Sequence, residues 1–448
     1  MEKLKIQQII EFTTGVSSKI FKSDGIVDNV TMDSRSVTGN SLFVAVKGDK
    51  HDAHDYVKSV VENGNYALVN EDFSEDLANL IYVKDTTLAL GMLASNYRQM
   101  FDIPVVAITG SNGKTTVKEM LRSVCNMYFG EEHVLATSGN LNNHWGMPRT
   151  LLEINKSHKV AIIEMGMNHS GELTYLSNLA KPTIAVVNNV MFAHAGHFSG
   201  LSDIASAKAE IYSGLLTSGI ACVDVSNQFA NDWLEKETKD KQLFLYGNES
   251  TACYIKSLST SEALYITPLG ELQLSLNVLG AHNYKNALTV IALAINLDCS
   301  LASIKCGLEA YCGYKGRLER KKAFNGALII DDTYNANPDS VAAALESIQV
   351  LAKPYWFIFA DLKELGINEV KYHYQVGELI TKYGVDKLLT VGDLAKYAND
   401  IFVGDKFHFA NNDDVVKYCR DNLPKEATLL IKGSNSMRLS NIVEQLLN

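Results

Sequence analysis

The sequence of 448 residues has little proline, no long apolar run and no excess of positive charge. Its 7 prolines and 30 glycines leave no room for long disordered linkers. No stretch approaches the ~18 apolar residues that a transmembrane helix requires, and the N-terminus lacks the apolar segment of a signal peptide. A net charge of −10 argues against a broad basic surface for nucleic acids. These absences predict a soluble globular protein with no transmembrane segment and no nucleic-acid partner.

Cysteine spacing excludes two further classes of site. The 7 cysteines form no CxxC pair and no Cys/His ligand spacing, which argues against a zinc site and against a disulfide framework. Reduced cysteines fit the cytoplasm best. We therefore expect a cytoplasmic protein. We also expect a monomer, while the sequence leaves open whether the protein self-associates.

Apolar runs alternate with helical segments along the chain, which predicts an α/β protein. Its length exceeds the ~100–200 residues usual for one domain, so we expect several domains. Residues 1–102 form a small α/β domain in this interpretation. Residues 103–314 carry buried strands such as Val160–Met165 and Thr183–Val190 between helices, as in a doubly wound, mostly parallel sheet. The alternation restarts in residues 315–448, which predicts a Rossmann-like third domain.

A glycine-rich loop between a predicted strand and a predicted helix is the most informative motif. The apolar residues 105–108 precede Thr109–Thr116, whose sequence is TGSNGKTT. Glycines let backbone N–H groups approach a polyphosphate, Lys114 can bridge its distal phosphates, and the Thr115 hydroxyl can hold Mg²⁺. The general pattern has glycine where this chain has Ile108, so the loop is a compact variant. We predict that a nucleotide is bound by Gly110, Ser111, Asn112, Gly113, Lys114, Thr115 and Thr116.

Two side chains follow buried strands, at the edge where open α/β sheets bind their ligands. Glu164 closes the strand that begins at Val160, which favours a metal ligand; pairing with a neighbouring base is the alternative. His194 comes just past the next apolar strand, so it can share the same crevice. A purely structural histidine is the alternative there.

Lys208 shares a helix face with apolar residues. In the predicted helix Ser202–Leu216, it lies between Ile204 and Ile211 at helical spacing, so we expect it to point inward. Burial lowers the pKa of an amine and makes it nucleophilic, so it could react with CO₂ to give a carbamate with carboxylate-like oxygens. In the alternative interpretation, the aliphatic stem carries the ammonium out to solvent.

The segment after the predicted strand Ala327–Ile330 offers acceptors for a ribose. Asp331 and Asp332 follow the strand directly, and Asn335 comes next, before an Asn-Pro pair suited to a helix start. The pattern leaves open which aspartate faces a ligand. Arg317 lies at the junction with the third domain, where it could reach a phosphate or form an interdomain ion pair.

Taken together, these segments resemble the Mur ligase family over nearly the whole chain. Asp33-Ser34-Arg35 and Ser41–Gly48 are similar to the family's UDP-binding domain, and Thr109–Thr116 is similar to its ATP loop. Ser138–Pro148 and Asp332–Pro338 resemble segments of the members that add a D-alanyl-D-alanine dipeptide. The Asp-Asn-Pro-Arg signature of the members that add the third amino acid is absent.

The resemblance implies an ATP- and Mg²⁺-dependent ligase. Such an enzyme joins D-alanyl-D-alanine to UDP-N-acetylmuramoyl-tripeptide through an acyl phosphate, in peptidoglycan precursor synthesis. By this resemblance, the UDP-linked substrate contacts Ser34, Arg35, Asn140 and Asn143, and the nucleotide contacts Asn283, Arg317, Asp332 and Asn335 besides the loop. The implied Mg²⁺ ligands are Thr115, Glu164, His194 and carbamylated Lys208, of which the last three form the catalytic set together with Lys114.

Two positions depart from the family pattern. Ala360 stands where glycine is usual, and Asn435 stands where arginine is common, which leaves the contacts to the dipeptide open. Arg438 could substitute if the predicted helix 436–447 faces the cleft. A tripeptide-forming ligase or folylpolyglutamate synthetase is the alternative within the superfamily, and a P-loop ATPase that makes no bond is the alternative outside it. The sequence leaves open whether the tripeptide ends in lysine or diaminopimelate.

Overall fold

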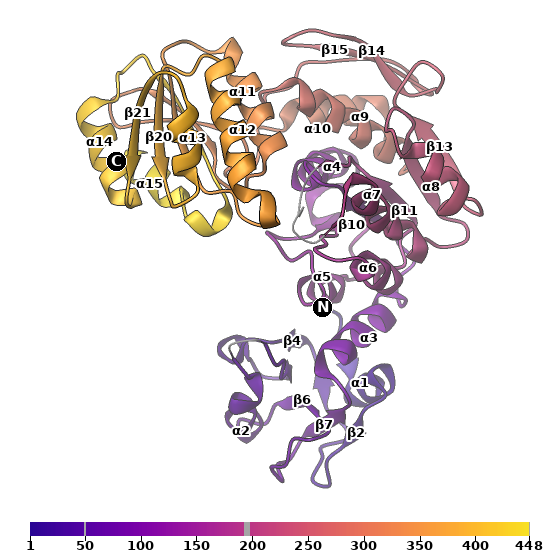
Figure 1. The fold of residues 1–448 in the computed structure, drawn as a ribbon. Coiled ribbons are helices and arrows are strands. Elements are labelled where there is room, and N and C mark those ends of the chain that lie inside the picture. The colour runs from indigo at the N-terminus through magenta and orange to yellow at the C-terminus, as the bar shows by residue number, and fades with distance from the viewer. Residues whose placement is uncertain (49–50, 192–197, 448) are drawn as a thin grey trace.

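The computed structural model describes residues 1–48, 51–191 and 198–447. The chain passes through three regions of mixed α/β structure, coloured from indigo to yellow in Figure 1. Most strand pairs in the three large sheets are parallel, which confirms the predicted fold class. The N-terminal region lies at one end of the molecule, and the C-terminal region lies beside the middle region at the other end (Figure 1).

The N-terminal region is built on a five-stranded sheet of order β2-β7-β6-β5-β4, in which only β2 runs antiparallel to its neighbour. A separate antiparallel pair joins β1 to β3. The strands are β1 Leu4–Lys5, β2 Val16–Ser17, β3 Ile26–Val27, β4 Asn29–Thr31, β5 Ser41–Val44, β6 Tyr66–Asn70 and β7 Leu80–Val83. The helices are α1 Ile6–Thr13, α2 Val57–Glu62 and α3 Thr86–Arg98.

The middle region contains a six-stranded parallel sheet of order β13-β12-β11-β8-β10-β9. Its strands are β8 Val105–Thr109, β9 Val134–Ala136, β10 Val160–Glu164, β11 Ile184–Val187, β12 Ile220–Asp224 and β13 Gln242–Tyr246. The helices of this region are α4 Lys114–Phe129, α5 Gly146–Leu152, α6 Glu172–Ala180, α7 Leu201–Ala209, α8 Ala230–Lys236, α9 Ala281–Ile295 and α10 Leu301–Ala310.

Alternate residues of β8 point to opposite faces of this sheet, and both faces are buried. Val105 and Ala107 pack in the core that includes α5 and α6, whereas Val106 and Ile108 pack in the core that includes α4 and α9. A strand covered on both faces is apolar throughout, which is why these runs were recognisable in the sequence. The parallel strands all end at one edge, and the loops there carry the candidate site.

A small antiparallel sheet beside α9 and α10 was not predicted. It has the order β14-β15-β16, with β14 at Tyr254–Leu258, β15 at Ala263–Thr267 and β16 at Gly270–Leu274. In β15, Ala263, Tyr265 and Thr267 are buried, and the residues between them are half-buried. The sequence itself does not alternate, because the half-buried Leu264 and Ile266 are apolar as well, so the strand carried no period-two signal.

The C-terminal region contains a six-stranded sheet of order β17-β18-β22-β19-β20-β21, parallel except for the edge strand β17. One core, with α11 to α13, covers one face, and a second core, with α14 and α15, covers the other. The strands are β17 Glu319–Lys322, β18 Leu328–Asp332, β19 Tyr355–Ala360, β20 Lys387–Val391, β21 Asp405–Phe409 and β22 Thr428–Lys432. The helices are α11 Pro338–Ser347, α12 Glu369–Lys382, α13 Ala395–Ile401, α14 Asn412–Asn422 and α15 Ser440–Leu447.

The predicted boundary between residues 102 and 103 does not coincide with a break in the apolar core. One continuous core runs from Leu4 to Trp233, since α3 packs against α5 and α6. The domain boundaries 102/103 and 314/315 stay predictions.

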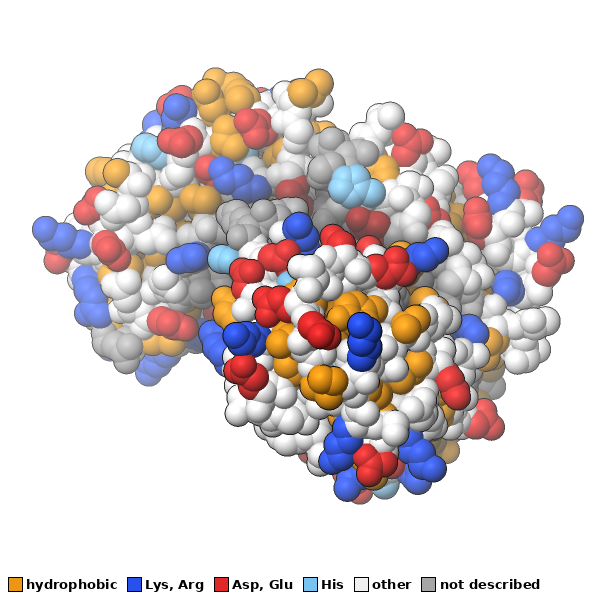
Figure 2. All heavy atoms as spheres, turned by 90° about the horizontal axis from the view of Figure 1, so that it is seen from below, with side chains coloured by type: hydrophobic (Ala, Val, Ile, Leu, Met, Phe, Trp, Pro, Cys, Tyr) orange, Lys and Arg blue, Asp and Glu red, His pale blue; other side chains and the backbone are white. Residues whose placement is uncertain are grey.

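Viewed from the N-terminal end, acidic and basic side chains are interspersed on the surface (Figure 2). None of the helices formed by the described residues is long and apolar enough to cross a membrane.

Candidate active site

The glycine-rich loop has the predicted strand before it and the predicted helix after it. Gly110 and Gly113 adopt φ angles of +154° and +76°, and Gly113 directly precedes α4. A Cβ atom on Gly113 would lie 2.7 Å from the Asn286 side-chain oxygen and 2.9 Å from the Asn188 side-chain nitrogen. Glycine is required at this position on both conformational and steric grounds.

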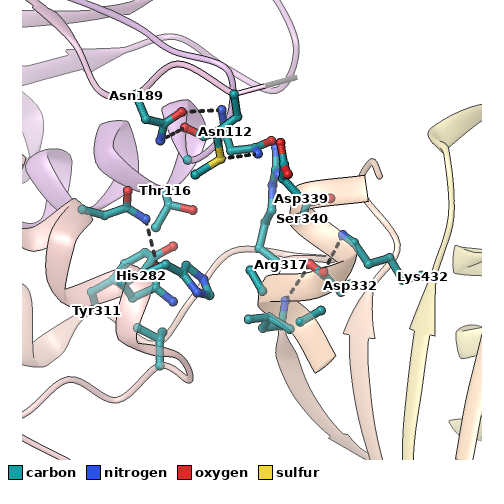
Figure 3. Close-up of a pocket in the computed structure, with 18 residues that line it drawn as sticks. Asn112, Thr116, Asn189, His282, Tyr311, Arg317, Asp332, Asp339, Ser340 and Lys432 are labelled. Atoms are coloured by element: carbon teal, nitrogen blue, oxygen red, sulfur yellow. Dashed lines mark hydrogen bonds and ion pairs between the residues drawn. The ribbon is translucent and has the colours of Figure 1, made fainter. Parts of the chain in front are cut away.

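Two asparagines that follow β11 hold this loop in place. The Asn112 N–H donates to the Asn189 side-chain oxygen at 2.9 Å, and the Asn189 amide donates back to the Asn112 carbonyl oxygen at 2.9 Å (Figure 3). Asn188 donates to the same carbonyl at 3.1 Å. The predicted strand Thr183–Val190 was therefore too long, because β11 ends at Val187 and the next two residues turn toward the loop.

The Lys114 ammonium lies inside the loop. It donates to the carbonyl oxygens of Gly110 at 2.7 Å and Ser111 at 3.2 Å. Burial lowers the pKa of this ammonium, and the negative charge of Glu164 acts in the opposite direction. A polyphosphate at the start of α4 would supply a stronger counter-charge, so the geometry suits a nucleotide phosphate.

Glu164 has a buried carboxylate oxygen that lacks a partner among the described residues. The side chain is 1% exposed, its Oε1 accepts from the Asn142 amide at 2.8 Å, and its Oε2 accepts no hydrogen bond there. Thr115 is also 1% exposed, and it lines the same cavity as Glu164, the larger of the two cavities described below. A buried carboxylate needs a counter-charge, so Glu164 and the Thr115 hydroxyl fit a hard divalent cation such as Mg²⁺.

Lys208 is buried on α7, as the helix spacing predicted. The residue is 2% exposed, so its stem does not carry the ammonium out to solvent. Burial lowers its pKa well below the ordinary value of 10.5, and the positive charge of Lys114 adds to this shift. A neutral, nucleophilic amine is what carbamate formation requires. The helix itself ends at Ala209 and continues only as a 3₁₀ turn, Glu210–Gly214, so the predicted helix was too long.

His194 was predicted to share this crevice, and it lies outside the described residues. Its proposed part in metal binding stays a prediction. Among the described residues, no group of three or more His, Cys, Asp and Glu side chains is placed to hold a metal ion.

A cavity of about 120 Å³ lies between the loop and the C-terminal region (Figure 3). The predicted nucleotide residues Asn112, Gly113, Thr116, Asn283, Arg317 and Asp332 line it, together with His282, Tyr311 and Lys432. Figure 3 shows Thr116, Asn189, His282 and Tyr311 on one side and Asp332 and Lys432 on the other. Burial lowers the pKa of His282, so its ring is neutral and offers both a donor and an acceptor.

The two consecutive aspartates point to different places. Asp332 lines the cavity, where its carboxylate pairs with the buried Lys432 ammonium and accepts from the Leu318 N–H at 3.2 Å. Asp331 does not line it: it pairs with Lys321 at 2.6 Å and accepts from the Thr333 hydroxyl at 2.7 Å. Of the two aspartates, Asp332 is therefore the one positioned for a ligand.

A larger cavity of about 850 Å³ adjoins the first, and Arg317 lines both. The Arg317 guanidinium lies 4.2 Å from the centre of the Tyr334 ring, and its buried Nε has no hydrogen-bond partner among the described residues. Besides Arg317, the predicted residues that line the larger cavity are Ser111, Asn112, Gly113, Lys114, Thr115, Asn140, Asn143, Glu164 and Asn335.

Ser34 and Arg35 line neither cavity. Arg35 is exposed and forms a bidentate pair with Asp33, with its Nη2 at 2.8 Å. Hydrogen bonds from Arg35 lower the pKa of Asp33 to about 2. The predicted contact of these residues with a UDP group stays a prediction.

Sequence reasoning missed the buried residues that position the site. Lys118 is fully buried, and its ammonium donates to the Thr137 carbonyl oxygen at 2.7 Å. The Thr137 hydroxyl in turn accepts the Glu164 N–H at 2.9 Å. Lys118 thereby links helix α4 to the strand end that carries Glu164. A lysine four residues after Lys114 was the available signal.

His373 anchors a loop that borders the larger cavity. Its ring is fully buried, accepts the Leu362 N–H at 3.0 Å through Nε2, and lies 2.6 Å from the Glu369 carbonyl oxygen through Nδ1. These bonds need a neutral ring with the proton on Nδ1. Burial lowers the pKa of His373, whereas the Glu369 carbonyl and the nearby Asp361 act in the opposite direction.

The lowered pKa of His373 predicts a loss of stability in acid. The unfolded ring takes up a proton near pH 6.5 and the folded ring only at lower pH, so the unfolding free energy falls as pH drops through 6.5. We expect His373→Gln to weaken this dependence, measured by urea unfolding between about pH 7.5 and about pH 5.5. At the upper pH the substitution should cost about 1–3 kcal/mol, because a buried partner is left poorly bonded. Equal pH dependence in both proteins would contradict this role.

A phosphate loop that faces a second, mostly parallel sheet across a shared cavity is typical of enzymes that bind a nucleotide beside a second substrate. Three family models match the chain: the Mur ligase family catalytic domain over residues 26–98, the Mur ligase middle domain over 108–294, and the Mur ligase glutamate ligase domain over 316–435. The chain belongs to the Mur ligase family.

Individual relatives match over the full length. The chain is 35% identical over 457 residues to the UDP-N-acetylmuramoyl-tripeptide–D-alanyl-D-alanine ligase of Haemophilus influenzae, covering 100% of this chain and 99% of the relative. The crystal structure of MurF from Acinetobacter baumannii superimposes with a TM-score of 0.92 at 32% identity, covering 100% and 99%. MurF of Thermotoga maritima in complex with ADP shares the fold, with a TM-score of 0.82 at 23% identity and coverage of 94% and 97%.

Proposed function

We propose that the protein is an ATP-dependent ligase that joins D-alanyl-D-alanine to UDP-N-acetylmuramoyl-tripeptide in peptidoglycan precursor synthesis. Full-length similarity to a ligase of that name, at 35% identity, is the observation that carries the proposal. The phosphate loop beside a cavity of about 850 Å³ provides room for a peptide substrate next to a nucleotide. The 7 cysteines are free thiols, which fits a reducing cytoplasm. A monomeric enzyme stays our prediction.

The nucleotide and its metal would be held by residues of the middle and C-terminal regions. Lys114, Arg317 and the backbone of residues 110–116 would bind the phosphates of ATP, with Asn283 and Asp332 along the rest of the nucleotide. Thr115, Glu164 and carbamylated Lys208, with His194 as predicted, would hold Mg²⁺. When bound, this cation supplies electrostatic stabilisation of the phosphoryl oxygens.

The reaction requires two successive displacements. The terminal carboxylate of the tripeptide attacks the γ-phosphorus of ATP, which forms an acyl phosphate and releases ADP. The dipeptide amine then attacks the acyl carbon, loses a proton and expels inorganic phosphate, which leaves the amide bond of the pentapeptide. Negative charge develops on phosphoryl and carbonyl oxygens in both steps, so Lys114 and Arg317 act by positioning and by electrostatic stabilisation.

Substrate-dependent phosphate release tests this proposal directly. We expect ATP and Mg²⁺ to yield phosphate only with both UDP-N-acetylmuramoyl-tripeptide and D-alanyl-D-alanine, and mass spectrometry to identify the UDP-linked pentapeptide. Tripeptides ending in lysine and in diaminopimelate should be compared, because their relative kcat/KM gives the natural substrate. Release without the dipeptide would instead indicate an ATPase, and release with folate and glutamate would indicate a folylpolyglutamate synthetase.

A further inference from the structure

The larger cavity is lined by three Lys and Arg side chains of the described residues: Lys114, Arg317 and Lys363. Lys114 lies in the phosphate loop, and Arg317 also borders the smaller nucleotide cavity. Lys363 instead lies on the C-terminal wall, in the loop after β19, with its side chain 45% exposed. Arg438 was the expected cation on this wall, but it is exposed, precedes α15 and does not line the cavity.

Neighbouring strands fix the position of Lys363. Strands β19 and β22 are paired in parallel, so the loops that follow them lie side by side at one sheet edge. The Lys363 N–H donates to the Ser434 hydroxyl at 2.8 Å, and the Ser434 N–H donates to the Asp361 carbonyl oxygen at 3.1 Å. Ser434 therefore fixes the backbone of this loop at Asp361 and at Lys363.

The ion pair of Lys363 with Asp361 leaves N–H groups of the ammonium available for a ligand. Lys363 donates to Asp361 at 2.9 Å. The other Asp361 oxygen accepts the backbone N–H groups of Leu394 at 2.9 Å and Ala395 at 2.8 Å, so three donors share this carboxylate. An ammonium has three N–H donors, and two of them remain for a ligand that enters the cavity.

We propose that Lys363 binds the terminal carboxylate of the dipeptide substrate and selects acceptors that carry this group. The inference rests on the proposed function. The dipeptide reacts through its amine, so its carboxylate enters the cavity unchanged and needs a cationic partner there. Asn435, on the same wall, is uncharged, and its amide already donates to the Tyr334 carbonyl oxygen at 2.9 Å. Lys363 is the cation on this wall, away from the phosphate loop.

A comparison of D-alanyl-D-alanine with D-alanyl-D-alaninamide tests this role, because the amide lacks the carboxylate. The wild type should prefer the acid, and Lys363→Met should lower kcat/KM for the acid by about 10- to 100-fold, mostly through the KM of the dipeptide. The same variant should treat acid and amide nearly alike. Lys363→Arg should keep the preference, which distinguishes lost charge from a damaged loop. Lys371→Met, which removes an exposed lysine from α12, is the matched control and should behave as wild type.

Three results would overturn the inference. Lys363→Met could lower kcat/KM equally for acid and amide, or it could raise the KM of the tripeptide instead of the dipeptide, or the wild type could show no preference for the acid. Failure of the proposed function gives a different result, since the wild type would then form no pentapeptide with any dipeptide.

Discussion

Lys114→Ala is expected to lower kcat by on the order of a thousandfold or more. In the proposed function, Lys114 is the cation of the phosphate loop that binds the transferred phosphate, and loss of one preorganised charge at a phosphoryl or oxyanion site has effects of this size. The fold should persist, because among the described residues the Lys114 ammonium donates to two carbonyl oxygens of its own loop and to no other group. Phosphate release under saturating substrates measures the loss, and circular dichroism checks the fold.

The control for Lys114→Ala removes a lysine from the same region without touching the loop. Lys159 is exposed and directly precedes β10, so Lys159→Ala should retain wild-type turnover. Near-wild-type turnover of Lys114→Ala would remove the phosphate loop from the mechanism. ATP binding should weaken in parallel, which calorimetry with a non-hydrolysable analogue would detect.

Lys208→Ala is expected to lose activity by about a hundredfold to a thousandfold if the lysine acts as a carbamate. Short carboxylic acids such as acetate should restore part of it, because the cavity left by the side chain admits a carboxylate in the same place. Circular dichroism checks that the fold persists, because truncation of a buried side chain leaves a cavity. Turnover measured against acetate concentration is the readout.

Lys208→Met serves as the companion to this experiment. Methionine fills the same volume and cannot form a carbamate, so activity should be low and acetate should not restore it. Full activity of Lys208→Ala would refute the role, and equal rescue of both variants would show that acetate acts elsewhere. Depletion of CO₂ and bicarbonate should lower the activity of the wild type alone.

Strands buried on both faces were predicted well, and strands with one polar face were not. The apolar run Lys387–Val391 coincides with β20, because its middle is covered by helices on both sides. Strand β17 is an edge strand of sequence ERKK, which carries no apolar signal at all. Its pairing with β18 is formed by backbone hydrogen bonds, and no apolar pattern in the local sequence predicts it.

In the candidate site too, features formed by consecutive residues could be predicted from the sequence, and contacts between distant residues could not. The loop Thr109–Thr116 was predictable because strand, loop and helix are consecutive in the chain. Its support by Asn189 joins residues 77 positions apart, and the ion pair of Lys432 with Asp332 joins residues 100 positions apart. Such partners are set by the strand order of the sheets, so their roles appear only in the folded structure.

Because Arg317 lines both cavities, the two are adjoining compartments with one guanidinium at their boundary. This arrangement has a consequence for inhibitor design. A compound with a flat heterocycle in the smaller compartment and a dipeptide mimic in the larger, joined by an anionic linker at Arg317, would lose its translational and rotational freedom only once. It should therefore bind more tightly than either fragment, because it would occupy both compartments at once.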